Sequence, residues 1–68
     1  MRKYERRHII AEALFDEIDK IWIVSIEGIE GTDTCYDKRT VGKTAVSFAA
    51  SQLNCSPSLV ILDRVIYQ

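Results

Sequence analysis

Several features that mark large classes of proteins are missing from this sequence. No apolar run reaches the ~20 residues that a membrane-spanning helix needs, and the charged stretch over residues 2–8 is not followed by the apolar region of a secretion signal. Neither sign of charge dominates, because nine basic residues stand against ten acidic ones. This balance argues against a protein that coats nucleic acid or an anionic membrane. We therefore expect a cytoplasmic protein with no membrane partner.

Cysteine and histidine are also scarce. Cys35 and Cys55 flank a stretch of helical composition, and a helix of about 14 residues would hold its ends ~21 Å apart. A disulfide needs Cα atoms within ~7 Å of each other, so we expect both cysteines to stay reduced. His8 is the only histidine, and the paired spacings of zinc ligands are absent. The sequence therefore predicts no metal site and no cofactor.

No complete nucleotide-binding or catalytic motif is present in the sequence. Residues 41–44 (Val-Gly-Lys-Thr) resemble the end of a phosphate-binding P-loop, but the motif needs a glycine where this sequence has Asp37. An acidic side chain at that position repels the phosphate that the loop would hold. As a general base, His8 would need a neighbouring nucleophile or acid, and the sequence specifies none. We therefore expect that the protein is not an enzyme.

Apolar periodicity predicts the order helix, strand, short strand, helix, strand. A stripe at helical spacing predicts a first helix over residues 3–19. Its members are Tyr4, Ala11, Leu14, Phe15 and Ile18. The β-branched and aromatic run that follows predicts a strand over 21–27. Gly28 and Gly31 allow a tight turn, after which residues 32–36 form either a short returning strand or a loop.

The second half of the chain has clearer signals for where its elements begin and end. Residues 40–54 are rich in alanine and serine and predict a second helix, which either Thr40 or Asp37 can cap. Asn54 suits the end of that helix. The apolar residues that follow predict a last strand over 59–67.

These elements predict an α+β fold in one compact domain spanning residues 1–68. Two helices would pack on a small sheet of two or three strands. Strand 21–27, helix 40–54 and strand 59–67 would form a β–α–β unit. If its two strands are neighbours and parallel, the crossover should be right-handed, and an antiparallel arrangement through the intervening hairpin is the alternative.

The small size of the chain bears on its oligomeric state. A chain of 68 residues buries only ~60% of its unfolded surface on folding. A sheet of two or three strands also leaves unpaired edges, and these strands are apolar on both faces. With neither a disulfide nor a metal to stabilise the fold, a symmetric homodimer is expected, formed by edge pairing or by burial of the exposed sheet face.

Charge is unevenly distributed along the predicted first helix. Basic residues crowd its start and acidic residues crowd its end, which opposes the helix dipole at a cost of only ~0.3–1 kcal/mol per exposed residue. An order that helix stability does not favour indicates either a binding surface or random drift.

Two binding hypotheses follow from these charges. In the first, acidic residues form a surface that complements a basic groove on a larger protein and occupies the place of nucleic-acid phosphates. These residues are Glu12, Asp16, Glu17, Asp19, Glu27, Glu30, Asp33 and Asp37. Such a protein would act by occlusion, as an inhibitor or adaptor of the kind that phages and other mobile elements encode. In the alternative, a small nucleic-acid-binding regulator uses Arg2, Lys3, Arg6 and Arg7 to contact phosphates.

Overall fold

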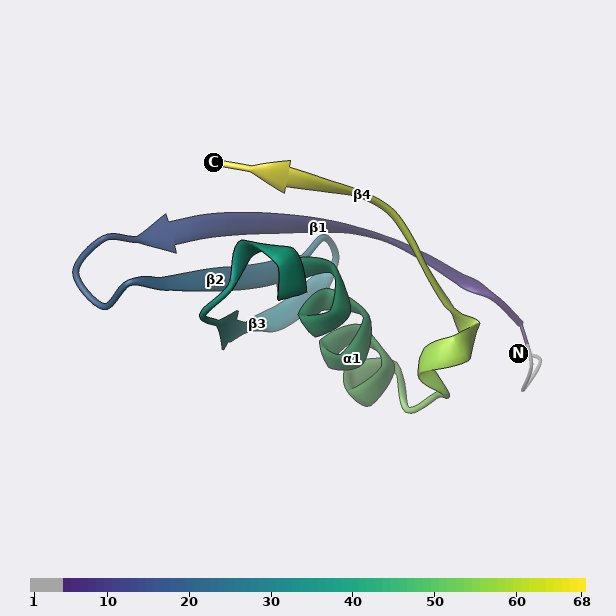
Figure 1. Cartoon of the computed structure of the whole chain (residues 1–68). Helices are drawn as coiled ribbons and strands as arrows, with labels where there is room; N and C mark the ends of the chain where they lie inside the picture. The colour runs from purple at the N-terminus through teal and green to yellow at the C-terminus, as the bar shows by residue number, and fades with distance from the viewer. Residues whose placement is uncertain (1–4) are drawn as a thin grey trace.

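The computed structural model describes residues 5–68, and this part of the chain forms one α-helix on a mixed four-stranded sheet (Figure 1). The sheet order is β3–β2–β1–β4. The strands are β1 (Arg7–Asp16), β2 (Ile21–Ile26), β3 (Ile29–Cys35) and β4 (Val60–Tyr67). The helix α1 (Val41–Leu53) follows the single-turn 3-10 helix η1 (Lys38–Thr40) and precedes a second one, η2 (Pro57–Leu59).

The predicted first helix over residues 3–19 is wrong, because most of this segment is strand β1. The same residues also alternate with the period of a strand, and the side chains at 9, 11 and 13 are buried while those at 8 and 14 are exposed. β1 pairs with β2 on one side and β4 on the other, and such pairing overrides local helix propensity. Tyr4, which the predicted stripe included, lies outside the described residues.

The predicted fold class is wrong for the same reason. The expected two helices on a sheet of two or three strands become one helix on four strands, since the first predicted helix is a central strand of the sheet. The strands predicted over 21–27 and 59–67 are not neighbours in the sheet. β1 lies between β2 and β4, and it pairs antiparallel with the first and parallel with the second.

The other predicted elements are confirmed within one to three residues. β2, α1 and β4 match the segments 21–27, 40–54 and 59–67. The returning strand predicted over 32–36 is also present, and it begins earlier than predicted, at Ile29. Asn54 ends α1 in the left-handed conformation, with a φ of 55°.

Small side chains set the distance between the helix and the sheet. Ala11 and Ala13 of β1 and Ala45 and Ala49 of α1 belong to one buried cluster and have no exposed surface. Alanine at these positions lets the helix backbone approach the sheet closely, and interiors of this density tolerate little added volume. Figure 1 shows α1 on one side of the sheet only.

The other side of the sheet, which we call the open face, is not covered by any helix of the described residues. Strand alternation and register place eleven side chains of β1, β2 and β4 on it. They are His8, Ile10, Glu12, Leu14, Asp16, Ile21, Ile23, Ser25, Ile61, Arg64 and Ile66. Leu14 and Ile23 form a cross-strand pair there, and Leu14 is 49% exposed. The open face is therefore partly apolar.

Enlarging a side chain between helix and sheet should destabilise the fold. We expect Ala45→Leu to lower the free energy of unfolding by ~1–3 kcal/mol, because the extra atoms have no space against the sheet. Ser47→Leu, two residues along on the exposed side of α1, should change it by less than ~0.5 kcal/mol. Urea unfolding followed by circular dichroism measures both. Equal effects would contradict the close packing of α1.

Candidate functional site

The loop between β1 and β2 projects beyond α1 and forms one end of the molecule (Figure 1). Asp16 holds its conformation: Oδ1 accepts hydrogen bonds from the backbone N–H of Ile18 at 2.9 Å and of Asp19 at 3.3 Å. The backbone N–H of Lys20 also donates to the carbonyl of Asp16 at 2.7 Å. The side chain of Ile18 is nonetheless 91% exposed. The turn therefore holds a large apolar side chain out in solvent.

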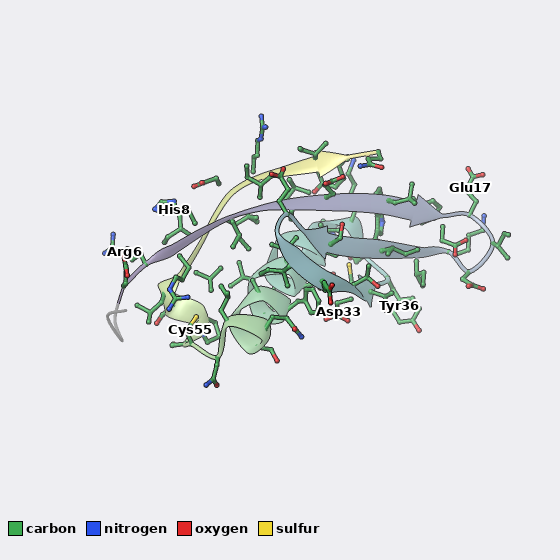
Figure 2. All side chains as sticks on the ribbon, turned by 180° about the vertical axis from the view of Figure 1, so that it is seen from behind. Arg6, His8, Glu17, Asp33, Tyr36 and Cys55 are labelled. Atoms are coloured by element: carbon green, nitrogen blue, oxygen red, sulfur yellow. The ribbon has the colours of Figure 1, made fainter. Side chains whose placement is uncertain are left out.

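The exposed large apolar side chains all lie toward this end of the sheet. Those among the described residues are Leu14, Ile18, Tyr36 and Tyr67. Strand register places them at one end, because Tyr67 pairs with Ala13 and Tyr36 follows the pair formed by Cys35 and Trp22. Leu14 lies on the open face and Tyr67 on the face that α1 covers. Figure 2 shows Tyr36 and Glu17 at this end and Arg6 and His8 at the other. We call residues 14–20 with Tyr36 and Tyr67 the hairpin end.

An aromatic cluster supports the hairpin end on the face that α1 covers. The ring of Trp22 lies 5.1 Å from that of Phe15 and 5.7 Å from that of Tyr67, the latter edge to face. The Lys38 ammonium lies 4.7 Å from the centre of the Tyr67 ring, within the range of cation–π attraction. Sequence analysis missed this cluster, because only the register of three strands brings these residues together.

Three of the eight predicted acidic residues gather at the hairpin end, namely Asp16, Glu17 and Asp19. The other five are spread over the molecule. Glu12 lies on the open face and accepts a hydrogen bond from Gln68. Glu27 lies in the turn after β2. Glu30 and Asp33 lie on β3, and Asp37 follows that strand. The structure therefore gathers only part of the predicted acidic surface at one place.

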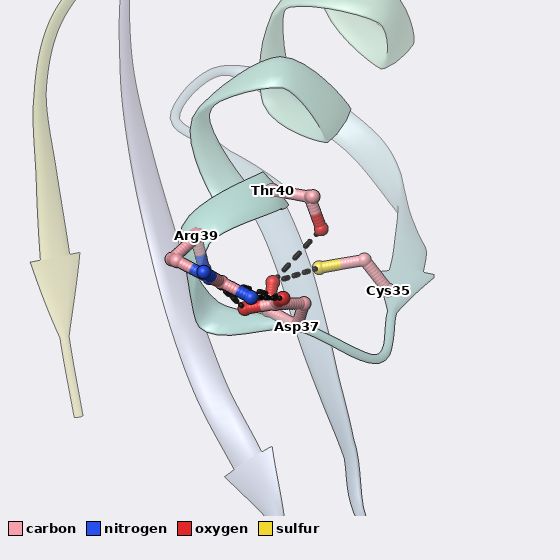
Figure 3. A network of polar contacts seen from close by, with 4 residues as sticks. All are labelled: Cys35, Asp37, Arg39 and Thr40. Carbon is pink, nitrogen blue, oxygen red and sulfur yellow. Dashed lines mark hydrogen bonds and ion pairs between the residues drawn. The ribbon is translucent and has the colours of Figure 1, made fainter.

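Asp37 makes hydrogen bonds with neighbouring residues of its own chain (Figure 3). Its carboxylate accepts from Arg39 Nη2 at 2.8 Å and from the Arg39 backbone N–H at 2.9 Å. The side-chain hydrogen bond from Arg39, followed by the backbone one, holds the pKa of Asp37 below its ordinary value. The carbonyl of Asp37 also accepts from Thr40 Oγ1 at 2.8 Å. Asp37 thus begins η1 and positions the start of α1.

The predicted basic site is described only in part. Arg2 and Lys3 lie outside the described residues. Arg6 is exposed, Arg7 is half-buried at the start of β1, and His8 Nδ1 lies 2.9 Å from Asp63 Oδ1. The argument from the helix dipole no longer applies to this charge order, because strands carry only small net dipoles. As a strand, however, β1 separates the basic and acidic ends by ~30 Å.

Groups suited to chemistry do not converge at the hairpin end. Among residues 5–68, no three His, Cys, Asp or Glu side chains are placed to share a metal ion. A depression between α1 and η2 is lined by apolar, hydroxyl, amide and thiol side chains, including Leu59, Cys55 and Ser58, and by no charged side chain.

No helix among residues 5–68 has the length and apolar character needed to cross a membrane.

Comparison with known proteins adds no assignment: no family model, curated protein or solved structure matches the chain.

Removing the Asp16 carboxylate should loosen the turn. We expect Asp16→Ala to increase amide hydrogen exchange at Ile18 and Asp19 and to cost about 1 kcal/mol of stability, since two backbone donors lose their acceptor. Asp16→Asn should have a smaller effect, because its amide oxygen still accepts. Equal exchange rates in the wild-type protein and Asp16→Ala would contradict this role.

Arg39→Ala should raise the pKa of Asp37 toward its ordinary value, because the largest cause of the lowered pKa is the side-chain hydrogen bond from Arg39. A carboxyl whose pKa is lower in the folded state stabilises the fold above its unfolded-state pKa, and this contribution is lost as the pH falls through the lower folded-state value. A carboxyl-detected NMR titration measures the shift. An unchanged pKa in Arg39→Ala would show that the hydrogen bonds do not hold in solution.

Proposed function

We propose that this protein is a non-enzymatic protein-binding module that inserts its hairpin end into an apolar groove with a basic rim on a larger protein. The observation that supports this proposal is the concentration of exposed Leu14, Ile18, Tyr36 and Tyr67 at the end of the molecule that also carries Asp16, Glu17 and Asp19.

The apolar part of the hairpin end supplies binding free energy. Clustered exposed apolar groups with a polar surround are typical of interaction sites, and aromatic side chains are enriched in protein interfaces. Ile18 can enter a pocket without first leaving a packed environment. The hydrogen bonds from Asp16 already order its turn, which lowers the entropy cost of binding.

The acidic part of the hairpin end supplies orientation and partner choice. Three carboxylates around Ile18 favour a basic rim and repel an acidic one, and such complementarity mainly raises the association rate and the specificity. A basic groove that normally holds nucleic-acid phosphates has this character. The protein would then act by occlusion, as a phage-type inhibitor or adaptor. A cytoplasmic location is part of this proposal, and the free state of Cys35 and Cys55 is consistent with it.

The proposed role of Ile18 is tested by affinity capture from the native host, with bound proteins quantified by mass spectrometry. Burying an isoleucine contributes ~1.5–3 kcal/mol, so a partner held by the wild-type protein should bind Ile18→Ala about tenfold more weakly, with the fold intact. Reversing charge with Glu17→Lys should slow association and reduce its dependence on salt.

Arg6→Ala is the matched control, because Arg6 is exposed at the opposite end. A partner lost with Arg6→Ala and retained by Ile18→Ala would overturn the proposal. Tight binding to random duplex DNA would also overturn the proposal. A dissociation constant below ~10⁻⁶ M at physiological salt is tighter than ordinary non-specific binding and would favour the nucleic-acid-binding alternative.

A further inference from the structure

The two edges of the described sheet differ in their ability to pair with another strand. β3 exposes the acidic residues Glu30 and Asp33, and its pairing with β2 is irregular around Gly31, where φ is +94°. Since the pairing of β4 is irregular as well, charge is what distinguishes the two edges, and charge of one sign protects an edge from pairing with a second copy. Two copies meeting at β3 would bring like charges together. β4, at the other edge, is apolar except for the adjacent Asp63 and Arg64.

A register shift in β4 determines which of its side chains share a face. β4 pairs in parallel with β1, but Leu62 pairs with Ile9 and Arg64 with Ile10, so Asp63 is an extra residue. On the two sides of this bulge, residues 60 and 62 and residues 65 and 67 lie on the face that α1 covers. Residues 61, 64 and 66 lie on the open face.

We infer that a second copy of this chain pairs antiparallel with β4 around a two-fold axis between Asp63 and Arg64. In this register Leu62 lies opposite Val65 of the second copy, Ile61 opposite Ile66, and Val60 opposite Tyr67. These three pairs are apolar, and each occurs twice by symmetry. Directly opposed apolar and aromatic side chains are the stabilising unit of an antiparallel sheet.

The bulge makes this register possible. When a two-fold axis perpendicular to the sheet relates two antiparallel strands, directly opposed residues have their side chains on the same face. In a strand without a bulge, residues 61 and 66 are five positions apart and would lie on opposite faces. The extra residue Asp63 restores the match, because Ile61 and Ile66 both lie on the open face. The same holds for Leu62 and Val65, which both pack against the core.

Charge complementarity favours a second copy of this chain as the occupant. At the axis, Asp63 of each copy lies beside Arg64 of the other, so two acid–base pairs replace the like charges that pairing through β3 would create. The antiparallel arrangement also turns the basic start of each β1 toward the hairpin end of the other copy, since β4 runs parallel to β1. Interfaces of this isologous kind are the commonest in homo-oligomers.

The charge part of the inference is tested by sedimentation equilibrium. The wild-type chain, of 7.8 kDa, should form a dimer at micromolar concentration. Arg64→Asp should raise the dimer dissociation constant at least tenfold, because four carboxylates then meet at the axis. The swapped variant Asp63→Arg/Arg64→Asp should restore the dimer. Asp33→Arg, on β3, should leave it unchanged.

The register is tested by disulfide formation in a Cys35→Ser/Cys55→Ser background, with circular dichroism confirming the fold of each variant. Ile61→Cys/Ile66→Cys should give a covalent dimer on oxidation, because opposed Cα atoms lie ~4.5–5.5 Å apart, within disulfide range. Ile61→Cys alone should not, since its two copies lie several residues apart along the strands.

Two results would overturn the inference. One is a monomer at all concentrations. The other is a dimer that withstands Arg64→Asp but is lost with Ile23→Lys, which would place the contact on the open face. Neither set of variants alters the turn that carries Ile18, so the dimer and the proposed function can fail separately.

Discussion

The close packing of α1 on the small side chains of β1 is the constraint on which the rest of the structure depends. Ala11 and Ala13 bring the helix against the sheet, and the chain then has only one α-helix among its described residues to cover a longer strand, β1. β1 has ten residues, which span ~33 Å, whereas the thirteen residues of α1 span ~20 Å. β1 therefore extends past the helix, and Figure 1 shows the loop between β1 and β2 at the end of this overhang.

The sequence predicted those elements in which only one periodicity is present. Residues 21–24 and 59–62 are continuous runs of β-branched, aliphatic and aromatic residues, and 40–54 is an alanine-rich segment with an end signal at Asn54. Each therefore favours one conformation. The segment 7–16 satisfies both periods and contains good helix formers. Its strand conformation depends on β2 and β4, which pair with it from later in the chain. No local pattern contains that information.

The candidate site was predictable only where its residues are adjacent in the sequence. The acids around Ile18 are visible as a charge run at the end of an apolar segment. Tyr36 and Tyr67 reach the same end through strand register, which is fixed by pairing over distances that periodicity does not cover. The place of Lys38 follows from its contact with the Tyr67 ring. Conversely, Asp37 counts as a free acid in the sequence, whereas its hydrogen bonds to Arg39 give it a structural role.

Strand direction connects the hairpin end with the β4 edge. β4 is parallel to β1, so Tyr67 lies at the hairpin end and Val60 at the basic end. Antiparallel pairing between two copies of β4 must then direct the two hairpin ends in opposite directions, with neither turn of residues 17–20 in the interface. A dimer built in this way would present two Ile18 turns at once, while Tyr67 of each hairpin end lies opposite Val60 of the other copy. Two linked binding sites raise the effective concentration for the second contact only if both can reach the partner together. The dimer would therefore favour a partner that is itself repeated or symmetric.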